Sequence, residues 1–218
     1  RLNCSNRLLP MLHFASYKVS FTLLALIAGQ LLIAQTYSAD SVSFEKKLAT
    51  ILGAEENQDY VKAMATAKEA LTFSREKKIV FGEAWSLIKI NDIQLAQENY
   101  IEKTAPPTAI IQAGKQLNDN KITGIGYLQA AQYKMYGNNH VEAEPLFEKA
   151  LQLLPPNDDY TALCWNERGF NASLKSELQT QAEYFLNALR IYEKLNNQSG
   201  AAMVYSNLSV LYNDLGQK

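Results

Sequence analysis

Apolar residues from Asp40 onward recur with helical spacing, and no segment shows the strict alternation of a strand. The stretch 201–216 shows this most clearly, because its apolar residues fall on one broad helix face. They are Met203, Val204, Leu208, Leu211, Tyr212 and Leu215. The same spacing occurs upstream, so the sequence predicts a chain built from helices.

The predicted helices repeat over a long period. Aromatic residues open four successive helical stretches at intervals of 42, 38 and 40 residues. They are Trp85, Tyr127, Trp165 and Tyr205. A second series lies between them, in which Phe147 and Phe185 are 38 residues apart, as are Ala150 and Ala188. Self-similarity at this period indicates helix hairpins stacked in a row, without a single closed core.

The stretch 205–216 carries aromatic residues at Tyr205 and Tyr212, with Leu208 and the small Ser209 between them. We expect Gly216 to end the helix in the left-handed conformation that glycine adopts readily. This series resembles the first helix of a tetratricopeptide repeat. The family motif is W-x2-L-G-x2-Y, followed by a turn glycine, A-x3-F-x2-A and a proline.

Two upstream units share the resemblance. Trp165 and Gly169 match the opening of the motif, with Arg168 in the leucine place, and Phe185 and Ala188 match the second helix. The preceding unit contributes Tyr127, Gly137, Ala143, Phe147, Ala150 and Pro155. In these units the small residues allow close helix approach, the aromatic residues separate neighbouring hairpins, and proline ends the second helix because it lacks an amide donor.

Earlier units match less well. Residues 60–71 are predicted to form a second helix behind a first helix at 44–51, and Trp85 opens the next unit. The partner helix of that unit, 109–117, follows Pro106-Pro107 and lacks the aromatic residue. The resemblance covers residues 41–218. It implies an all-α, right-handed superhelical solenoid of antiparallel hairpins, with about four and a half repeats of ~40 residues.

The N-terminal residues have the pattern of a processing segment. No acidic residue precedes Asp40, Met11 stands where an initiator would, and an apolar run covers 19–34 after Lys18. This run has the length of a signal-peptide core and is shorter than a membrane span of ~20 residues. We therefore expect upstream read-through at 1–10, a signal peptide at 11–39, and a C-terminally truncated repeat domain at 40–218. An uncleaved membrane anchor and an internal core helix are the alternatives.

Composition and charge limit the classes of function that the chain can have. The chain has 218 residues, of which 47% are hydrophobic, enough to fill a helix–helix core. Residues 40–218 contain 18 basic and 22 acidic residues, a net charge of −4, which gives no electrostatic reason to expect nucleic acid. Of the two cysteines only Cys164 follows the predicted signal, so no internal disulfide is expected there. Beside Trp165, it is best interpreted as a small buried apolar residue.

The search for catalytic chemistry finds little. The two histidines are His13, inside the predicted signal, and His140, which we interpret as a solvated turn residue. Zinc-type spacings of histidine or cysteine do not occur. Glu142, Glu144 and Glu148 share a helix surface that we expect to face solvent. The sequence thus predicts no catalytic residue, metal site or cofactor in this chain, and leaves open an enzyme domain beyond Lys218.

The resemblance implies a ligand groove along the first helix of each hairpin. Its expected positions are Leu163, Asn166, Phe170, Ser173, Met203, Ser206, Val210 and Asn213. Amide, hydroxyl and apolar groups together suit an extended peptide or a protein partner. Ordinary surface residues are the alternative interpretation.

An export signal, lengthened repeats and a truncated solenoid together resemble the periplasmic sensor region of repeat-containing histidine kinases of the Bacteroidetes. The resemblance implies a non-catalytic input region for signal transduction, periplasmic or held to the membrane through the parent protein, with a homodimer as one form. A free periplasmic scaffold or assembly factor is one alternative. A repeat domain attached to an unseen enzyme is another.

Overall fold

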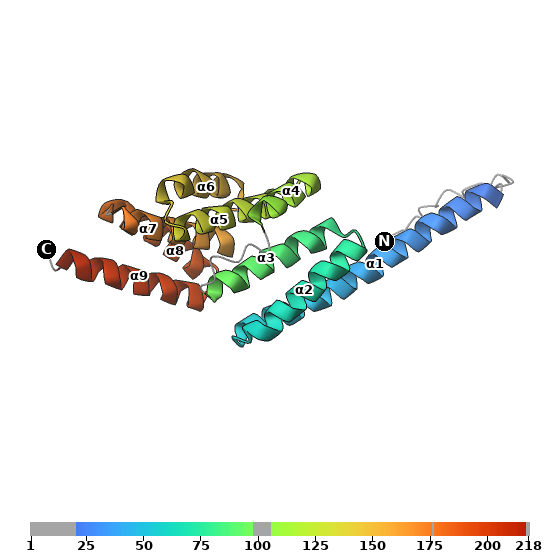
Figure 1. Cartoon of the computed structure of the whole chain (residues 1–218), viewed down its shortest axis with the longest axis horizontal. Coiled ribbons are helices and arrows are strands. Elements are labelled where there is room, and N and C mark those ends of the chain that lie inside the picture. Colours follow the sequence, from blue (N-terminus) through green and yellow to red (C-terminus); the bar gives the residue numbers. More distant parts are fainter. Residues whose placement is uncertain (1–20, 98–105, 176, 217–218) are drawn as a thin grey trace, which may run out of the picture. The chain divides into compact units, whose positions relative to one another are not determined.

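The computed structural model describes residues 21–97, 106–175 and 177–216, with side chains from residue 39 onward except that of Asp214. Within these ranges every regular element is one of nine helices, and no strand occurs (Figure 1). The helices are α1 (Phe21–Glu56), α2 (Tyr60–Glu76), α3 (Val80–Ala96), α4 (Pro107–Leu117), α5 (Asn120–Tyr136), α6 (His140–Leu153), α7 (Asp159–Leu174), α8 (Leu178–Lys194) and α9 (Gln198–Gly216). The predicted all-α class is confirmed.

The chain divides into two units, Arg1–Asp40 and Ser41–Lys218. Every side-chain contact given below lies within the second unit. The predicted read-through at 1–10 and the start of the predicted signal peptide lie outside the described residues. In the described part of the chain, no helix is both long enough and apolar enough to cross a membrane.

Helix length sets the repeat period. Four helices, α2, α3, α5 and α8, contain 17 residues each, and short turns connect successive helices. A pair of such helices with its turns matches the aromatic spacing of 38 to 42 residues. Two prolines act as predicted at helix ends: α4 begins at Pro107, and α6 ends two residues before Pro155.

Five of the described turns between helices share one backbone conformation. A residue at φ between 53° and 61° lies in each of them: Gln58, Lys78, Asn118, Asn138 and Asn196. The next residue then donates its amide to a carbonyl five positions earlier, as Asp119 does to Gly114 at 2.8 Å. This bond defines the Schellman motif, which satisfies carbonyls at a helix end.

Glycine does not supply these turns, contrary to the sequence prediction. No described glycine has a positive φ. Gly216 is itself helical, as the last residue of α9, so the predicted left-handed turn there is wrong. After Gly137 the left-handed residue is Asn138. Asparagine tolerates this conformation because its short polar side chain can bond locally.

From α2 onward, helices consecutive in the chain pack against each other, and α3, α5, α7 and α9 also contact one another in turn. Small residues permit the close approach: Ala63, Ala67 and Ala70 of α2 are fully buried, as are Ala143 and Ala150 of α6. The arrangement fits an all-α repeat fold. Each hairpin buries its apolar face against the next, as stacked repeats require.

The aromatic positions that revealed the repeat differ in burial. Phe147 and Phe185 are fully buried, whereas Trp85, Tyr127 and Trp165 are half-buried. Tyr205 and Tyr212 of α9 are exposed, at 54% and 57%. Ala188, Gly169 and Leu208 lie in the interior, while Gly137 and Pro155 lie at exposed turns. The phenylalanines of the second helices are therefore the most deeply buried of these rings.

Gly169 lies at a close contact between α7 and α8. A Cβ atom at this position would lie 2.6 Å from two ring carbons of Phe185. Real Cβ atoms do not approach so closely, and the buried ring has little room to move. Gly169 thus permits close helix packing here, without any special φ.

We predict that Gly169→Ala lowers the free energy of unfolding by about 1–3 kcal/mol, because the added methyl overpacks the α7–α8 contact. Gly53→Ala on α1 is the matched control, since a Cβ atom added there would meet nothing within 4 Å. That control should gain about 0.5–1 kcal/mol from helix propensity. Urea unfolding of both variants measures the difference, and equal effects would contradict the contact.

We predict that Lys78→Gly raises the free energy of unfolding by about 0.5–1 kcal/mol. Lysine at φ 57° is strained, and glycine relieves that strain at some cost in unfolded-chain entropy. Lys77, at φ −86°, is the control, and its replacement by glycine should not stabilise. Thermal unfolding compares the pair; a loss of stability in Lys78→Gly would disprove the strain.

Candidate functional site

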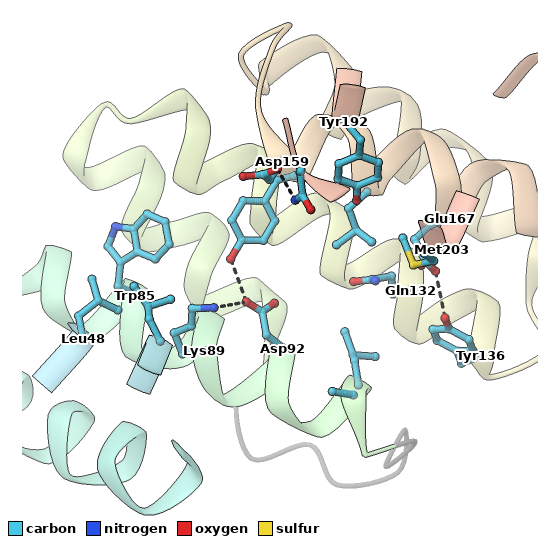
Figure 2. A pocket seen from close by; sticks show the side chains of 16 residues that line it. Leu48, Trp85, Lys89, Asp92, Gln132, Tyr136, Asp159, Glu167, Tyr192 and Met203 are labelled. Carbon is cyan, nitrogen blue, oxygen red and sulfur yellow. Dashed lines mark hydrogen bonds and ion pairs between the residues drawn. The ribbon is translucent and has the colours of Figure 1, made fainter. Parts of the chain in front are cut away.

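A cavity of about 790 Å³ opens on the side formed mainly by the odd-numbered helices. Its described lining residues come from α1, α3, α5, α7, α8, α9 and the turn before α9 (Figure 2). They are Leu48, Leu52, Trp85, Lys89, Asp92, Leu95, Ala96, Gln132, Tyr136, Asp159, Tyr160, Leu163, Glu167, Tyr192, Asn197 and Met203. Segments far apart in sequence thus converge on one space.

A charged cluster occupies one part of the wall. Lys89 of α3 donates to Glu55 at 2.9 Å and to Asp92 at 3.1 Å. Tyr160 of α7 donates its hydroxyl to the same Asp92 oxygen at 2.8 Å. Figure 2 shows the Lys89 ammonium beside this carboxylate. The cluster therefore ties α1, α3 and α7 together at the cavity.

Electrostatics fix the charge states of the cluster. Burial opposes the charged form of Lys89, but Asp92 and Glu55 outweigh it, so the pKa of Lys89 lies above its usual value. Burial raises the pKa of Glu55, with Lys89 acting against this. Burial, followed by the charge of Asp92, raises the pKa of Tyr160 well above that of a free phenol. Tyr160 is consequently a neutral donor at physiological pH.

Amide side chains extend the cluster to α5. Gln129 donates to the second oxygen of Asp92 at 2.9 Å and receives a bond from Asn91, also at 2.9 Å. Tyr133 donates to Asn91 at 3.1 Å. Asn91 and Gln129 are buried, so these bonds replace water that both side chains have lost. Asp92 thereby receives donors from three helices.

Glu167 of α7 lies at another part of the lining. Its side chain is buried, and its Oε2 accepts a bond from Tyr136 of α5 at 3.0 Å (Figure 2). Burial raises its pKa to about 7, although bonds from Tyr136, Asn166 and Gln132 act in the opposite direction. Each of these donors is neutral. Glu167 is therefore a buried carboxyl that titrates near physiological pH.

Two of the predicted groove residues, Leu163 and Met203, line the cavity. Asn166 was expected to face outward, but it is buried, and its Oδ1 accepts from Asn207 of α9 at 2.8 Å. That interpretation is corrected, because the amide joins α7 to α9 and is not available as a ligand contact.

The other predicted groove residues are not among the described lining residues. Phe170 is exposed beside the Tyr136 ring, with centroids 6.4 Å apart. Ser173 and Ser206 donate their hydroxyls to carbonyls of their own helices, at 2.6 and 3.0 Å. Val210 and Asn213 are exposed on α9. The cavity thus lies nearer the start of α7 and α9 than the motif suggested.

The sequence interpretation missed most of the lining, including Trp85 as a cavity residue, Tyr160 and Glu167. One signal was available, because Lys89 and Asp92 lie three positions apart inside the apolar stretch 87–93. Charged residues on a helix face expected to be buried are rare unless they are paired. Their presence could have indicated a buried polar cluster.

Arg168, which departs from the family leucine, has a packing role of its own. Its guanidinium lies 4.5 Å from the Tyr184 ring centroid and 5.6 Å from that of Trp165. It donates to Glu144 at 2.6 Å and to Glu148 at 3.0 Å. Glu142 and Glu148 are exposed, as expected, whereas Glu144 is half-buried and its bond to Arg168 helps to hold α6 against α7.

Cys164 is fully buried, as predicted, with its thiol 3.7 Å from the Phe147 carbonyl, and burial raises its pKa.

His140 begins α6 and is half-buried, with Nδ1 shielded from water, so the solvated-turn interpretation is wrong. Among the described residues, no group of three histidine, cysteine, aspartate or glutamate side chains could hold a metal ion.

A scan against models of known protein families finds no match to this chain, and a search among curated proteins finds no match either.

We predict that stability falls as pH rises from about 5 to 8, through Glu167. Its folded pKa of about 7 exceeds the reference value of 4.5, so the folded state retains a proton that the unfolded chain loses. The free energy of unfolding should fall by on the order of 3 kcal/mol, given the difference between the folded and reference pKa values. Urea unfolding at several pH values measures it.

Glu167→Gln should remove this contribution and flatten the pH dependence, because the amide oxygen still accepts from Tyr136. The exposed Glu76→Gln is the matched control and should leave the wild-type slope unchanged. An unaltered slope in Glu167→Gln would show that another group titrates.

Proposed function

We propose that residues 41–218 form a non-catalytic repeat domain that binds a peptide segment of another protein in the 790 Å³ cavity. The observation that carries this proposal is the lining itself, to which α1, α3, α5, α7 and α9 all contribute side chains. A space built by successive repeats suits an extended ligand, which contacts one repeat after another.

The lining has the chemistry of a peptide site. Leu48, Leu163 and Met203 are among the side chains that would receive apolar groups of a peptide. The volume lies within the ~300–1,000 Å³ typical of ligand sites. Side chains of a peptide would enter the cavity while its backbone lay across the helices.

The charged cluster favours binding over chemistry. Asp92 accepts from Lys89, Tyr160 and Gln129, and the Lys89 ammonium is held by two carboxylates. Groups engaged in this way make a rigid wall, which lowers the entropy lost when a ligand binds. They are poorly placed to act as a free base or nucleophile.

A peptide display experiment tests the proposal. We predict that a random dodecapeptide library enriches binders on the full chain, and that Leu163→Trp lowers their affinity about tenfold or more by filling the cavity. Val141→Trp is the matched control, because Val141 is 79% exposed on α6 and is not among the described lining residues. Binders with equal affinity for both variants would place binding elsewhere, and a library without binders would overturn the proposal.

We extend the proposal to the parent protein, as an exported tetratricopeptide-type solenoid that forms the sensory input of a histidine kinase or related regulator. The motif residues, the ~40-residue period and the apolar N-terminal run support it. Sequencing the downstream reading frame should find an apolar span of ~20 residues followed by kinase motifs. A stop codon after one more helix would contradict the sensor and favour a periplasmic scaffold.

A further inference from the structure

The cavity lining carries an excess of negative charge. Its described residues include three carboxylates, those of Asp92, Asp159 and Glu167, but a single cation, Lys89. Glu55 adds a fourth carboxylate just behind Lys89, at 2.9 Å. One lysine therefore faces more acidic groups than it can neutralise, and its ammonium is already divided between Glu55 and Asp92.

The other two carboxylates have neutral donors. Asp159 accepts from the Asn197 amide at 2.9 Å, and Glu167 accepts from the Tyr136 hydroxyl at 3.0 Å. Burial raises the pKa of Tyr192, and the charges of Asp159 and Glu167 add to that effect, so both carboxylates lie near the same phenol. This end of the cavity holds negative charge without a described counter-charge.

Aromatic rings surround the same space. Trp85, Tyr136, Tyr160 and Tyr192 all line the cavity. The face of an aromatic ring attracts a cation, and the attraction grows when water is excluded. Rings beside unneutralised carboxylates make a site that favours an ammonium or guanidinium group over a neutral or acidic one.

Taking the peptide-binding function proposed above as its basis, we propose that the cavity selects basic peptide segments, with a lysine or arginine side chain pairing with Glu167 beside Tyr136 and Tyr192. The apolar lining around Leu163 receives the neighbouring side chains of the peptide. A small polyamine would satisfy the carboxylates but leave this apolar surface uncovered, and an acidic peptide would add like charge.

Binding of a cation favours the ionised form of Glu167, so affinity rises with pH between 6 and 8. The titratable groups around Glu167 are Tyr136 of α5, Cys164 of its own helix and Tyr192 of α8, while α9 contributes Met203. Glu167 itself has a pKa of about 7. Its proton must leave before a salt bridge forms.

The first experiment reads the sequences of cavity-dependent binders from the dodecapeptide library. Enrichment of lysine and arginine over the unselected library is expected. Binders that depend on the cavity but are not enriched in basic residues overturn this inference while the peptide-binding function stands. A library without cavity-dependent binders removes that function, and this inference with it.

The second experiment measures the affinity of one enriched peptide for the full chain at pH 6 and pH 8. Wild type should bind about tenfold more tightly at pH 8, and Glu167→Gln should lose about tenfold at pH 8 together with its pH dependence. Glu76→Gln, an exposed carboxylate on α2, is the control and should match wild type. A Glu167→Gln variant that folds and binds like wild type would overturn the assignment.

Competition with spermidine distinguishes the two sources of cation. The unlabelled peptide should displace its labelled form at concentrations at least tenfold below those of spermidine. Displacement by spermidine at the lower concentration would identify a small polyamine as the occupant and overturn the peptide assignment.

Discussion

Asp92 sets the geometry of the repeat domain around the cavity. Its carboxylate is hydrogen-bonded by Lys89 of its own helix, Gln129 of α5 and Tyr160 of α7. A carboxylate withdrawn from water is costly unless all of its lone pairs are satisfied. The position of α5 and α7 against α3 is therefore constrained by this group as well as by apolar packing, and the cavity is the space that these helices leave beside it.

Glu167 is a second carboxylate of the cavity lining, but it has no charged partner comparable to the lysine beside Asp92. Both carboxylates belong to the lining, but Asp92 has a lysine at 3.1 Å, whereas the donors to Glu167 are a phenol and amides. Neutral donors offset only part of the cost of burying a charge, so Glu167 retains a proton up to pH near 7. The lining therefore combines a fixed charged cluster with one group whose charge can respond to a ligand.

The sequence was sufficient to predict the helices, their period and the helix ends at Pro107 and Pro155, because these features depend on local spacing and on proline chemistry. It failed at the turns, where the left-handed residues are Asn118, Asn138 and even Lys78. Glycine was expected to supply turns at Gly137 and Gly216, but the left-handed residues are others, and Schellman hydrogen bonds compensate for their strain. The cavity was harder to predict, because Asp92 and Tyr160 are 68 positions apart in the sequence. No local sequence pattern indicates that their side chains form a hydrogen bond.

The bond between Tyr160 and Asp92 also changes how the repeats are coupled. In a simple stack each repeat contacts its neighbours only, and stability is a sum of nearest-neighbour contributions. Here α7 bonds to α3 while α5 contributes Gln129 to the same carboxylate, so three helices share one acceptor. Separating any one of them leaves Asp92 with an unmet hydrogen bond in a poorly hydrated site, which costs more than the packing area alone. The three helices that share Asp92 are therefore coupled by this hydrogen bonding as well as by apolar packing, and a ligand bound there acts on all three at once.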